Sequence, residues 1–394
     1  MENKKKVLFL CQYFFPEKIS SGILPFELAS ELVENNYDVY ALVGYPKEYY
    51  DGDPVKKKEL YNGIHITRFR YPQFNRKNKI GRVFNYLSFC IFLLFHLRNF
   101  KDVDFCFSYT NPPLLPFFSS IICKKKHIKL IITIYDLYPD AAIKANILRS
   151  NSIISKMINM ANDFSYRHCW KIIVLSSECK EYLMINKKIN KDKVVVIPNW
   201  YKDDSSSFPV QHDKLTIIYG GNMGIMQDMN SVLTLILLLK NEKNVEFILA
   251  GHGNKKEIIE NELKINNVKN CSVYGFLPKE QYDALMNKAD LAIVSLEQFA
   301  VGLGSPSKVY GYLCKGLPII AILSEKMEIC QDIIQYKCGY HYTNKNKNEI
   351  IKKIIDLAKD KDKLDNLKKN AISLYKIKYS LDVVKSKYIK LLNE

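Results

Sequence analysis

Residues 304–320 read GSPSKVYGYLCKGLPII, and this stretch carries the most information about the fold. Small residues precede an amphipathic helical run, so that free backbone N–H groups and the positive charge of Lys308 would meet at a helix N-terminus. The run stops at Gly316, which tolerates the left-handed conformation at a helix end, and Ile319 begins a buried strand. The stretch therefore predicts an anion site at the start of the helix, with a plain helix-to-strand connection as the alternative.

The same alternation of strands and helices runs through the whole chain. Strands are expected at residues 6–11, 39–43, 65–69, 105–109, 130–135 and 171–175, and again at 215–219, 245–250, 273–274, 291–294 and 319–322. At 394 residues the chain is too long for one ordinary core. The sequence thus predicts an α/β protein with two tandem Rossmann-like domains, at 1–198 and 199–380, with a polar linker at 202–213 and a helix at 381–394 that returns to the first domain.

The net charge of the chain is +17, of which +12 falls on residues 1–195. This asymmetry indicates an anionic partner: a nucleic acid, an anionic membrane or a phosphorylated substrate. A Lys-rich and Asn-rich composition inherited from the coding sequence is the alternative. The ten cysteines show no CxxC pair and no zinc-type spacing, so reduced thiols of a cytoplasmic protein are expected.

Membrane contact is a second expectation from composition. No signal peptide is expected at the N-terminus, and the apolar run at 86–97 is too short to span a bilayer. Residues 85–99 are apolar on nearly all faces and are flanked by Arg82, Arg98 and Lys101, so this segment is expected to rest in an anionic membrane interface. A helix buried in the first domain is the alternative.

Glycine turns follow successive strands of the second half. They occur at 220–224, 251–253 and 275, and the series ends at residues 305–308. Because the carboxyl ends of parallel strands share one sheet edge, these turns are expected to form one binding edge for a charged ligand. In the first half, Ser20, Ser21 and Gly22 follow the first strand in the same way, without the GxGxxG spacing of a dinucleotide site.

These motifs, together with DLYPD at 136–140, IPN at 197–199, GFLP at 275–278 and GLP at 316–318, resemble those of the GT-B-fold glycosyltransferases of family 4. The resemblance extends over essentially the whole chain and is strongest to the bacterial fucosamine-type transferases of surface-polysaccharide synthesis. It implies two domains facing each other across a cleft, with acceptor binding by the first and nucleotide-sugar binding by the second.

The resemblance also implies a reaction. The expected enzyme is a retaining hexosyltransferase that moves a sugar, an N-acetylated hexosamine or deoxyhexosamine, from a UDP donor to a lipid-linked saccharide in capsule, O-antigen or exopolysaccharide synthesis. It would work in the cytoplasm, peripherally on the inner face of the bacterial membrane, with no cofactor or metal and no nucleic-acid partner.

Residue roles follow from the glycine turns and from the resemblance. Lys308 and Asp136 are expected to be catalytic, the first stabilising the departing diphosphate and the second contacting the acceptor. Acceptor binding is also expected of Ser20, Ser21 and Gly22. Donor binding is expected of Gly221, Asn222, Gly224, Gln227, Gly251, His252, Phe276, Leu277, Ser305, Ser307, Lys308 and Val309.

The chain departs from the family pattern at several positions. Asn222 and Gln227 stand where an Arg and a Lys often hold the donor diphosphate, which leaves Lys308 as the evident side-chain cation of the donor motifs. The family's paired glutamates would fall on Leu303 and Gly311, and Glu297 does not simply take over their role. Tyr135 stands where a His often precedes the aspartate.

Two alternative functions stay open at this point. A UDP-sugar 2-epimerase could use the same fold, although it would need a cluster of acidic and histidine side chains in the cleft. A basic nucleic-acid-binding protein would explain the charge, although the lysines are not interleaved with aromatic residues in a recognised motif.

Overall fold

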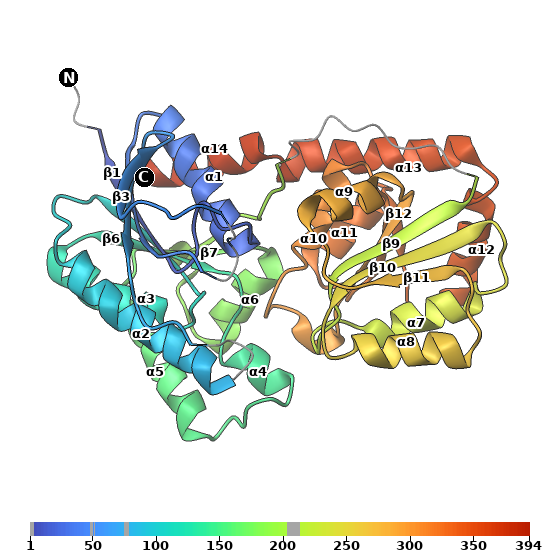
Figure 1. The fold of residues 1–394 in the computed structure, drawn as a ribbon, viewed down its shortest axis with the longest axis horizontal. Coiled ribbons are helices and arrows are strands. Elements are labelled where there is room, and N and C mark those ends of the chain that lie inside the picture. The colour runs from blue at the N-terminus through green and yellow to red at the C-terminus, as the bar shows by residue number, and fades with distance from the viewer. Residues whose placement is uncertain (1–3, 48–49, 51, 75–78, 203–212) are drawn as a thin grey trace. The chain divides into compact units, whose positions relative to one another are not determined.

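The computed structural model describes residues 4–47, 50, 52–74, 79–202 and 213–394. The chain folds into two compact units (Figure 1), of which unit 1 comprises residues 1–175, 179–197 and 385–394. Unit 2 comprises residues 176–178 and 198–384. Apart from the short segment 176–178, the chain passes between them at Ile197–Pro198 and again at Val384–Lys385. Positions 203–212 of the expected linker lie outside the described residues.

Unit 1 is built on an eight-stranded sheet with the strand order β3-β4-β2-β1-β5-β6-β7-β8. Its strands are β1 (Lys6–Cys11), β2 (Asp38–Gly44), β3 (Lys58–Tyr61), β4 (Ile64–Phe69), β5 (Phe105–Tyr109), β6 (Lys129–Ile134), β7 (Lys171–Val174) and β8 (Val194–Val196). The pairs are parallel except for β3 on β4 at one edge. From β1 the chain first adds strands on one side of the sheet and then, from β5 on, on the other side. Open α/β sheets bind ligands at such a switch point, here between β1 and β5.

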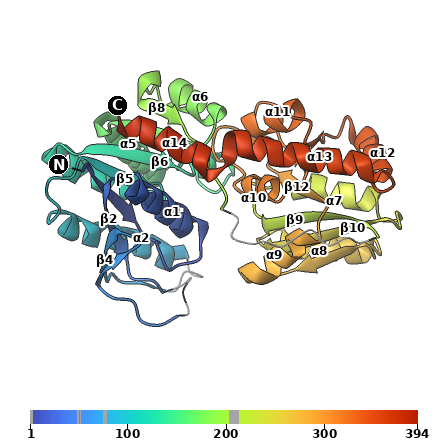
Figure 2. The ribbon, with the colours of Figure 1, turned by 90° about the horizontal axis from the view of Figure 1, so that it is seen from above.

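The helices of unit 1 are α1 (Ser20–Glu34), α2 (Lys79–Leu97), α3 (Leu115–Lys126), α4 (Asp140–Lys144), α5 (Ile153–His168) and α6 (Ser177–Asn186), with a short 3₁₀ turn at Lys191–Lys193. Helix α3 packs beside both α2 and α5, so these three helices form one layer (Figure 1). The last helix of the chain, α14 (Leu381–Leu392), packs in the same unit beside α1, where Lys385 forms an ion pair with Glu31 (Figure 2).

Helix α1 begins earlier than the sequence indicates. The sequence predicts this helix at residues 26–35, after a loop that ends in Ser20, Ser21 and Gly22. The helix nevertheless begins at Ser20 and carries Pro25 inside it. Ser20, Ser21 and Gly22 therefore lie in its first turn and not in the preceding loop, and the N–H of Gly22 donates to the Ile19 carbonyl at 2.8 Å.

Unit 2 contains a second sheet, whose six strands are all parallel and follow the order β11-β10-β9-β12-β13-β14. The strands are β9 (Leu215–Asn222), β10 (Val245–His252), β11 (Cys271–Tyr274), β12 (Leu291–Ser295), β13 (Ile319–Ile322) and β14 (Gly339–His341). The helices are α7 (Met229–Leu238), α8 (Lys256–Ile265), α9 (Lys279–Asn287), α10 (Lys308–Cys314), α11 (Glu328–Gln335), α12 (Lys347–Leu357) and α13 (Lys361–Leu374). A 3₁₀ turn at Gln298–Ala300 follows β12, and a π-helical turn at Tyr375–Tyr379 extends α13.

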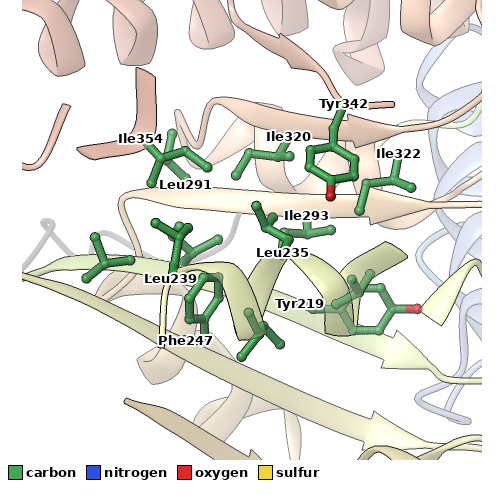
Figure 3. Packing of buried hydrophobic residues seen from close by; sticks show 14 of the residues in the cluster. Tyr219, Leu235, Leu239, Phe247, Leu291, Ile293, Ile320, Ile322, Tyr342 and Ile354 are labelled. Atoms are coloured by element: carbon green, nitrogen blue, oxygen red, sulfur yellow. The ribbon is translucent and has the colours of Figure 1, made fainter. Parts of the chain in front are cut away.

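Two apolar clusters hold this sheet, one on each face. Neighbouring residues of β9 alternate between them, because side chains of a strand point to opposite faces. Ile217 and Tyr219 pack with α7 and α12 in the cluster of Figure 3, whereas Ile218 packs with α10 and α11. Burial on both faces explains why these strands read as continuous apolar runs.

The fold prediction is confirmed in its main features. Every expected strand is present, with ends displaced by a few residues at most. The strands β3, β8 and β14 were not expected, since they are short and lie at sheet edges. Helix α10 is not amphipathic as expected but largely buried, from Val309 to Leu313. All ten cysteines are free.

Candidate active site

The glycine turns of unit 2 lie together at the carboxyl edge of its sheet. Strands β9 and β10 run in register up to the pairs Gly220–Ala250, Gly221–Gly251 and Asn222–His252. Strand order reverses at β9 and β12, so ligand binding is expected above these two strands. Residues 296–307 lead from β12 to Lys308 at the start of α10.

Close packing of backbones explains the glycines of the first two turns. Gly251 has a φ of +154°, and a Cβ atom there would lie 1.8 Å from the carbonyl oxygen of Gly221. Gly253 has a φ of +144°, and a Cβ atom there would lie 2.5 Å from the carbonyl oxygen of Met223. Gly221 itself has a φ of +104° and is exposed. Gly251 and Gly253 need glycine because a side chain would collide with the neighbouring backbone, whereas Gly221 needs it for its positive φ.

Lys308 lies beside the first glycine turn. A Cβ atom at Gly221 would be 3.9 Å from its Nζ, which lies 3.7 Å from the centre of the Tyr219 ring. The Nζ is buried and has no hydrogen-bond partner among the described residues, although the rest of the side chain is partly exposed. Burial lowers the pKa of Lys308 from 10.5 to about 7.

With a pKa of about 7, Lys308 is only partly protonated at neutral pH, so an anion that binds beside it would favour the full positive charge. A cation–π contact with Tyr219 favours the protonated form. It does not replace the hydrogen bonds that the ammonium group loses on leaving water. An anion beside Gly221 would supply them. The arrangement suits a group that becomes charged when an anionic ligand binds.

The other residues expected to bind the donor differ in their contacts and exposure. Gln227 folds back into its own turn, where its Oε1 accepts from the N–H of Gly224 at 3.1 Å. His252 and Phe276 form an edge-to-face ring pair with centroids 5.9 Å apart, and Phe276 is 76% exposed. Asn222 is exposed and Leu277 is half-buried.

Around the start of α10, the expected anion site is smaller than the sequence indicates. Ser307 is exposed, and the Ser305 hydroxyl lies 3.4 Å from that of Tyr310. Val309 is fully buried, and its N–H already donates to the Pro306 carbonyl. Val309 thus packs in the core of unit 2, and its expected contact with the nucleotide sugar stays a prediction.

Sequence reasoning missed a second cation of the donor edge. Lys255 follows the Gly251–Gly253 turn, and its Nζ donates to the Gln227 carbonyl at 2.7 Å and to Glu297 Oε1 at 2.8 Å. Lys308 is therefore not the sole side-chain cation of the donor motifs. The signal was a lysine two residues after the last glycine of the turn, but its partner lies 42 positions further along the chain.

Unit 1 carries the residues expected to bind the acceptor. Ser20 is exposed, the Ser21 hydroxyl is buried without a partner among the described residues, and Gly22 packs against the backbone of Phe14. Asp136 follows β6 at the same sheet edge. It keeps solvent contact, but the protein atoms around its carboxylate partly desolvate it and raise its pKa.

Asp136 has neighbours that the sequence did not indicate. The pKa of Tyr138 is raised mainly by burial and further by the negative charge of Asp136, while Arg82 lowers it. Tyr86, one turn after Arg82 on α2, also raises it. Asp136, Tyr86 and Arg82 thus lie close enough to Tyr138 to act on its charge, and the four side chains offer both donors and acceptors for hydroxyl or phosphate groups.

Comparisons with known proteins agree with this architecture. Residues 25–205 match the family model described as Glycosyltransferase Family 4, and residues 201–374 match the one described as Glycosyl transferases group 1. The chain belongs to the glycosyltransferases. A probable glycosyltransferase, WbjE of Pseudomonas aeruginosa, is 25% identical over 69% of this chain and 71% of its own length.

Other similar proteins fall in the same class. The phosphatidylinositol N-acetylglucosaminyltransferase GPI3 subunit of Saccharomyces cerevisiae is 20% identical over 72% of this chain, and the match spans 61% of the yeast protein. A putative colanic acid biosynthesis glycosyl transferase of Escherichia coli, WcaI, is 28% identical over 34% of this chain and 37% of its own length. Anabaena HepE, solved with UDP and glucose, shares the fold with a TM-score of 0.68 over 99% of both chains, at 13% identity. This glycosyltransferase therefore has the GT-B fold.

Two structural features bear on partners. None of the helices in the described ranges is long and apolar enough to cross a membrane. Within the same residues, no group of three or more His, Cys, Asp and Glu side chains is placed to hold a metal ion.

Proposed function

We propose that this glycosyltransferase moves a sugar from a UDP donor to a lipid-linked saccharide, with retention of the anomeric configuration. The observation that carries the proposal is the buried Nζ of Lys308 beside the exposed glycine turn at Gly221, because an unpaired amine at a switch point suits an anionic leaving group. The UDP complex of HepE and the N-acetylglucosaminyltransferase activity in the name of the yeast relative support the choice of donor.

The proposed reaction needs no protein nucleophile. The bond between the anomeric carbon and the β-phosphate oxygen breaks, and the acceptor oxygen bonds to that carbon on the same face. The acceptor proton passes to the departing diphosphate, whose growing charge Lys308 stabilises as an ammonium. Asp136 orients the acceptor hydroxyl, and Ser20, Ser21 and Gly22 contact the saccharide. No metal takes part in this scheme.

The proposed biological role is the synthesis of a bacterial surface polysaccharide such as a capsule, an O-antigen or an exopolysaccharide. The colanic acid assignment of WcaI supports it. A lipid-linked acceptor would hold the enzyme at the inner face of the cytoplasmic membrane, and the exposed apolar residues of α2 suit such contact. The family matches favour transfer over the epimerase and nucleic-acid-binding alternatives.

A donor panel tests this function. The purified protein is incubated with UDP-, GDP- and dTDP-sugars, with and without EDTA, and mass spectrometry detects the hydrolysed donor and the extended lipid-linked acceptor. Turnover of a UDP-N-acetylhexosamine or its deoxy analogue, unchanged by EDTA, is the expected result. Calorimetry should give tighter binding of UDP than of ATP or NAD, and the reverse order would rule out the donor assignment.

A further inference from the structure

The turn between β9 and α7 is held from both sides by the loops that follow β10 and β12. On the β10 side, Met223 donates its N–H to the His252 carbonyl at 2.7 Å and accepts from the N–H of Lys255 at 3.0 Å. On the β12 side, the N–H of Glu297 donates to the Met226 carbonyl at 2.9 Å. Backbone contacts alone therefore place both Lys255 and Glu297 against this turn.

The side chains of the same two residues close the arrangement. Lys255 Nζ lies 2.8 Å from Glu297 Oε1 and 2.7 Å from the Gln227 carbonyl. The two side chains are 22% and 28% exposed, so water reaches the pair only in part. An ammonium group has three hydrogens, of which two are used here. One ion pair thus links three strand-end loops, of which the central one carries Gly224 and Gln227.

We propose that Lys255 and Glu297 form a positioning pair, which sets the backbone of the turn at residues 223–227 for the diphosphate of the donor. The inference rests on the proposed use of a nucleoside diphosphate donor. It explains why a carboxylate is tolerated near an anion site, since the neighbouring ammonium cancels its charge at short range. It also gives a role to a glutamate outside the family's spacing.

A direct phosphate contact by Lys255 is the competing explanation. The two explanations predict opposite changes in the UDP affinity of the Glu297→Gln variant. If Lys255 bound the diphosphate itself, Glu297 would compete for the ammonium, and Glu297→Gln would tighten UDP binding. If the pair positions the turn, both Lys255→Met and Glu297→Gln weaken UDP binding. Lys256 and Glu260 supply a matched control, because their ion pair at 2.6 Å has similar exposure but lies within α8.

The test measures UDP and uridine affinities of the wild type, the two single variants, the double variant and Lys256→Met. Each single change should weaken UDP binding about tenfold, or 1.4 kcal/mol, and the double change should do little more because both remove one contact. The uridine affinity of these variants should equal that of the wild type, whereas general destabilisation of the protein would lower the affinity for both UDP and uridine. Tighter UDP binding by Glu297→Gln, or fully additive losses, would overturn the proposal.

Amide hydrogen exchange tests the pair without any ligand. The N–H groups of Met223 and Glu297 should exchange faster in Lys255→Met and in Glu297→Gln than in the wild type, and Lys256→Met should leave them unchanged. Because this readout needs no donor, a wrong donor assignment does not affect it. Unchanged exchange in both variants would show that the pair does not hold the turn.

Discussion

A lysine whose amine lies buried against an aromatic ring gains its charge when a ligand brings a counter-charge. Burial lowers the pKa of Lys308 to about 7, far below the 10.5 of an exposed lysine. A diphosphate bound beside Gly221 would favour the ammonium form and raise this pKa again. At a pH above the pKa that Lys308 has without ligand, binding of the diphosphate is then linked to the uptake of a proton.

The linkage predicts the pH dependence of donor binding. Below pH 7 the amine is already protonated, so UDP binding should take up no proton at Lys308. As the pH rises above 7, UDP affinity should fall while each binding event takes up close to one proton. Calorimetry at pH 8 in buffers of different ionisation enthalpy measures this number. A Lys308→Ala protein that takes up as many protons as the wild type would contradict the assignment.

The same residue should dominate turnover. Lys308→Ala should lower the turnover rate about 10²- to 10³-fold with little effect on folding, because one preorganised charge contact to the leaving group is lost. Lys308→Arg should restore turnover only in part, since the planar guanidinium differs from the ammonium in shape and reach. Near-normal turnover of a folded Lys308→Ala protein, measured with its true donor, would exclude this role.

At the scale of elements, the donor edge depends on how closely β9 and β10 approach at their carboxyl ends. Gly251→Ala should cost about 1–3 kcal/mol of stability and abolish UDP binding, because the new methyl group would collide with the Gly221 carbonyl. Thermal unfolding and UDP calorimetry measure both effects.

Gly275 provides the control in the same series of turns. A Cβ atom there meets no atom within 4 Å, so Gly275→Ala should leave both stability and UDP binding close to the wild type. Equal effects of the two substitutions would show that backbone approach is not the reason for the glycine at 251.

For the molecule as a whole, charge and exposed apolar side chains gather on one layer of unit 1. Helices α2 and α3 contain no Asp or Glu, and α5 contains only Asp163. Exposed apolar side chains lie along α2 (Val83, Phe84, Ile91, Phe92 and Phe95) and along α5 (Ile153, Ile154, Met157 and Met160). An apolar surface with basic residues suits an anionic lipid interface.

Vesicle sedimentation tests this expectation. The protein should bind vesicles that contain phosphatidylglycerol and not pure phosphatidylcholine, with binding that weakens at high salt. Phe84→Asp or Phe95→Asp should weaken binding about tenfold, since an apolar side chain no longer enters the interface. Ile265→Asp, at a still more exposed site on unit 2, serves as the control. Equal losses of vesicle binding in all three variants would argue against membrane contact through the helix layer of unit 1.

The sequence by itself determined the two α/β domains, the positions of most of their strands and the glycine turns at the strand ends. Buried parallel strands need continuous apolar runs, and a turn such as Gly251 needs glycine, so both leave a local signature. For the same reason the short edge strands β3, β8 and β14 were missed, and Pro25 concealed the true start of α1.

Tertiary structure alone decided the chemistry of the donor edge. The low pKa of Lys308 arises from the burial of its amine against Tyr219, which lies 89 positions earlier in the chain. The pairing of Lys255 with Glu297 likewise depends on a neighbour distant in sequence. A charge state or an ion pair is a property of the surroundings of an atom, and those surroundings exist only after the strands have brought their ends together.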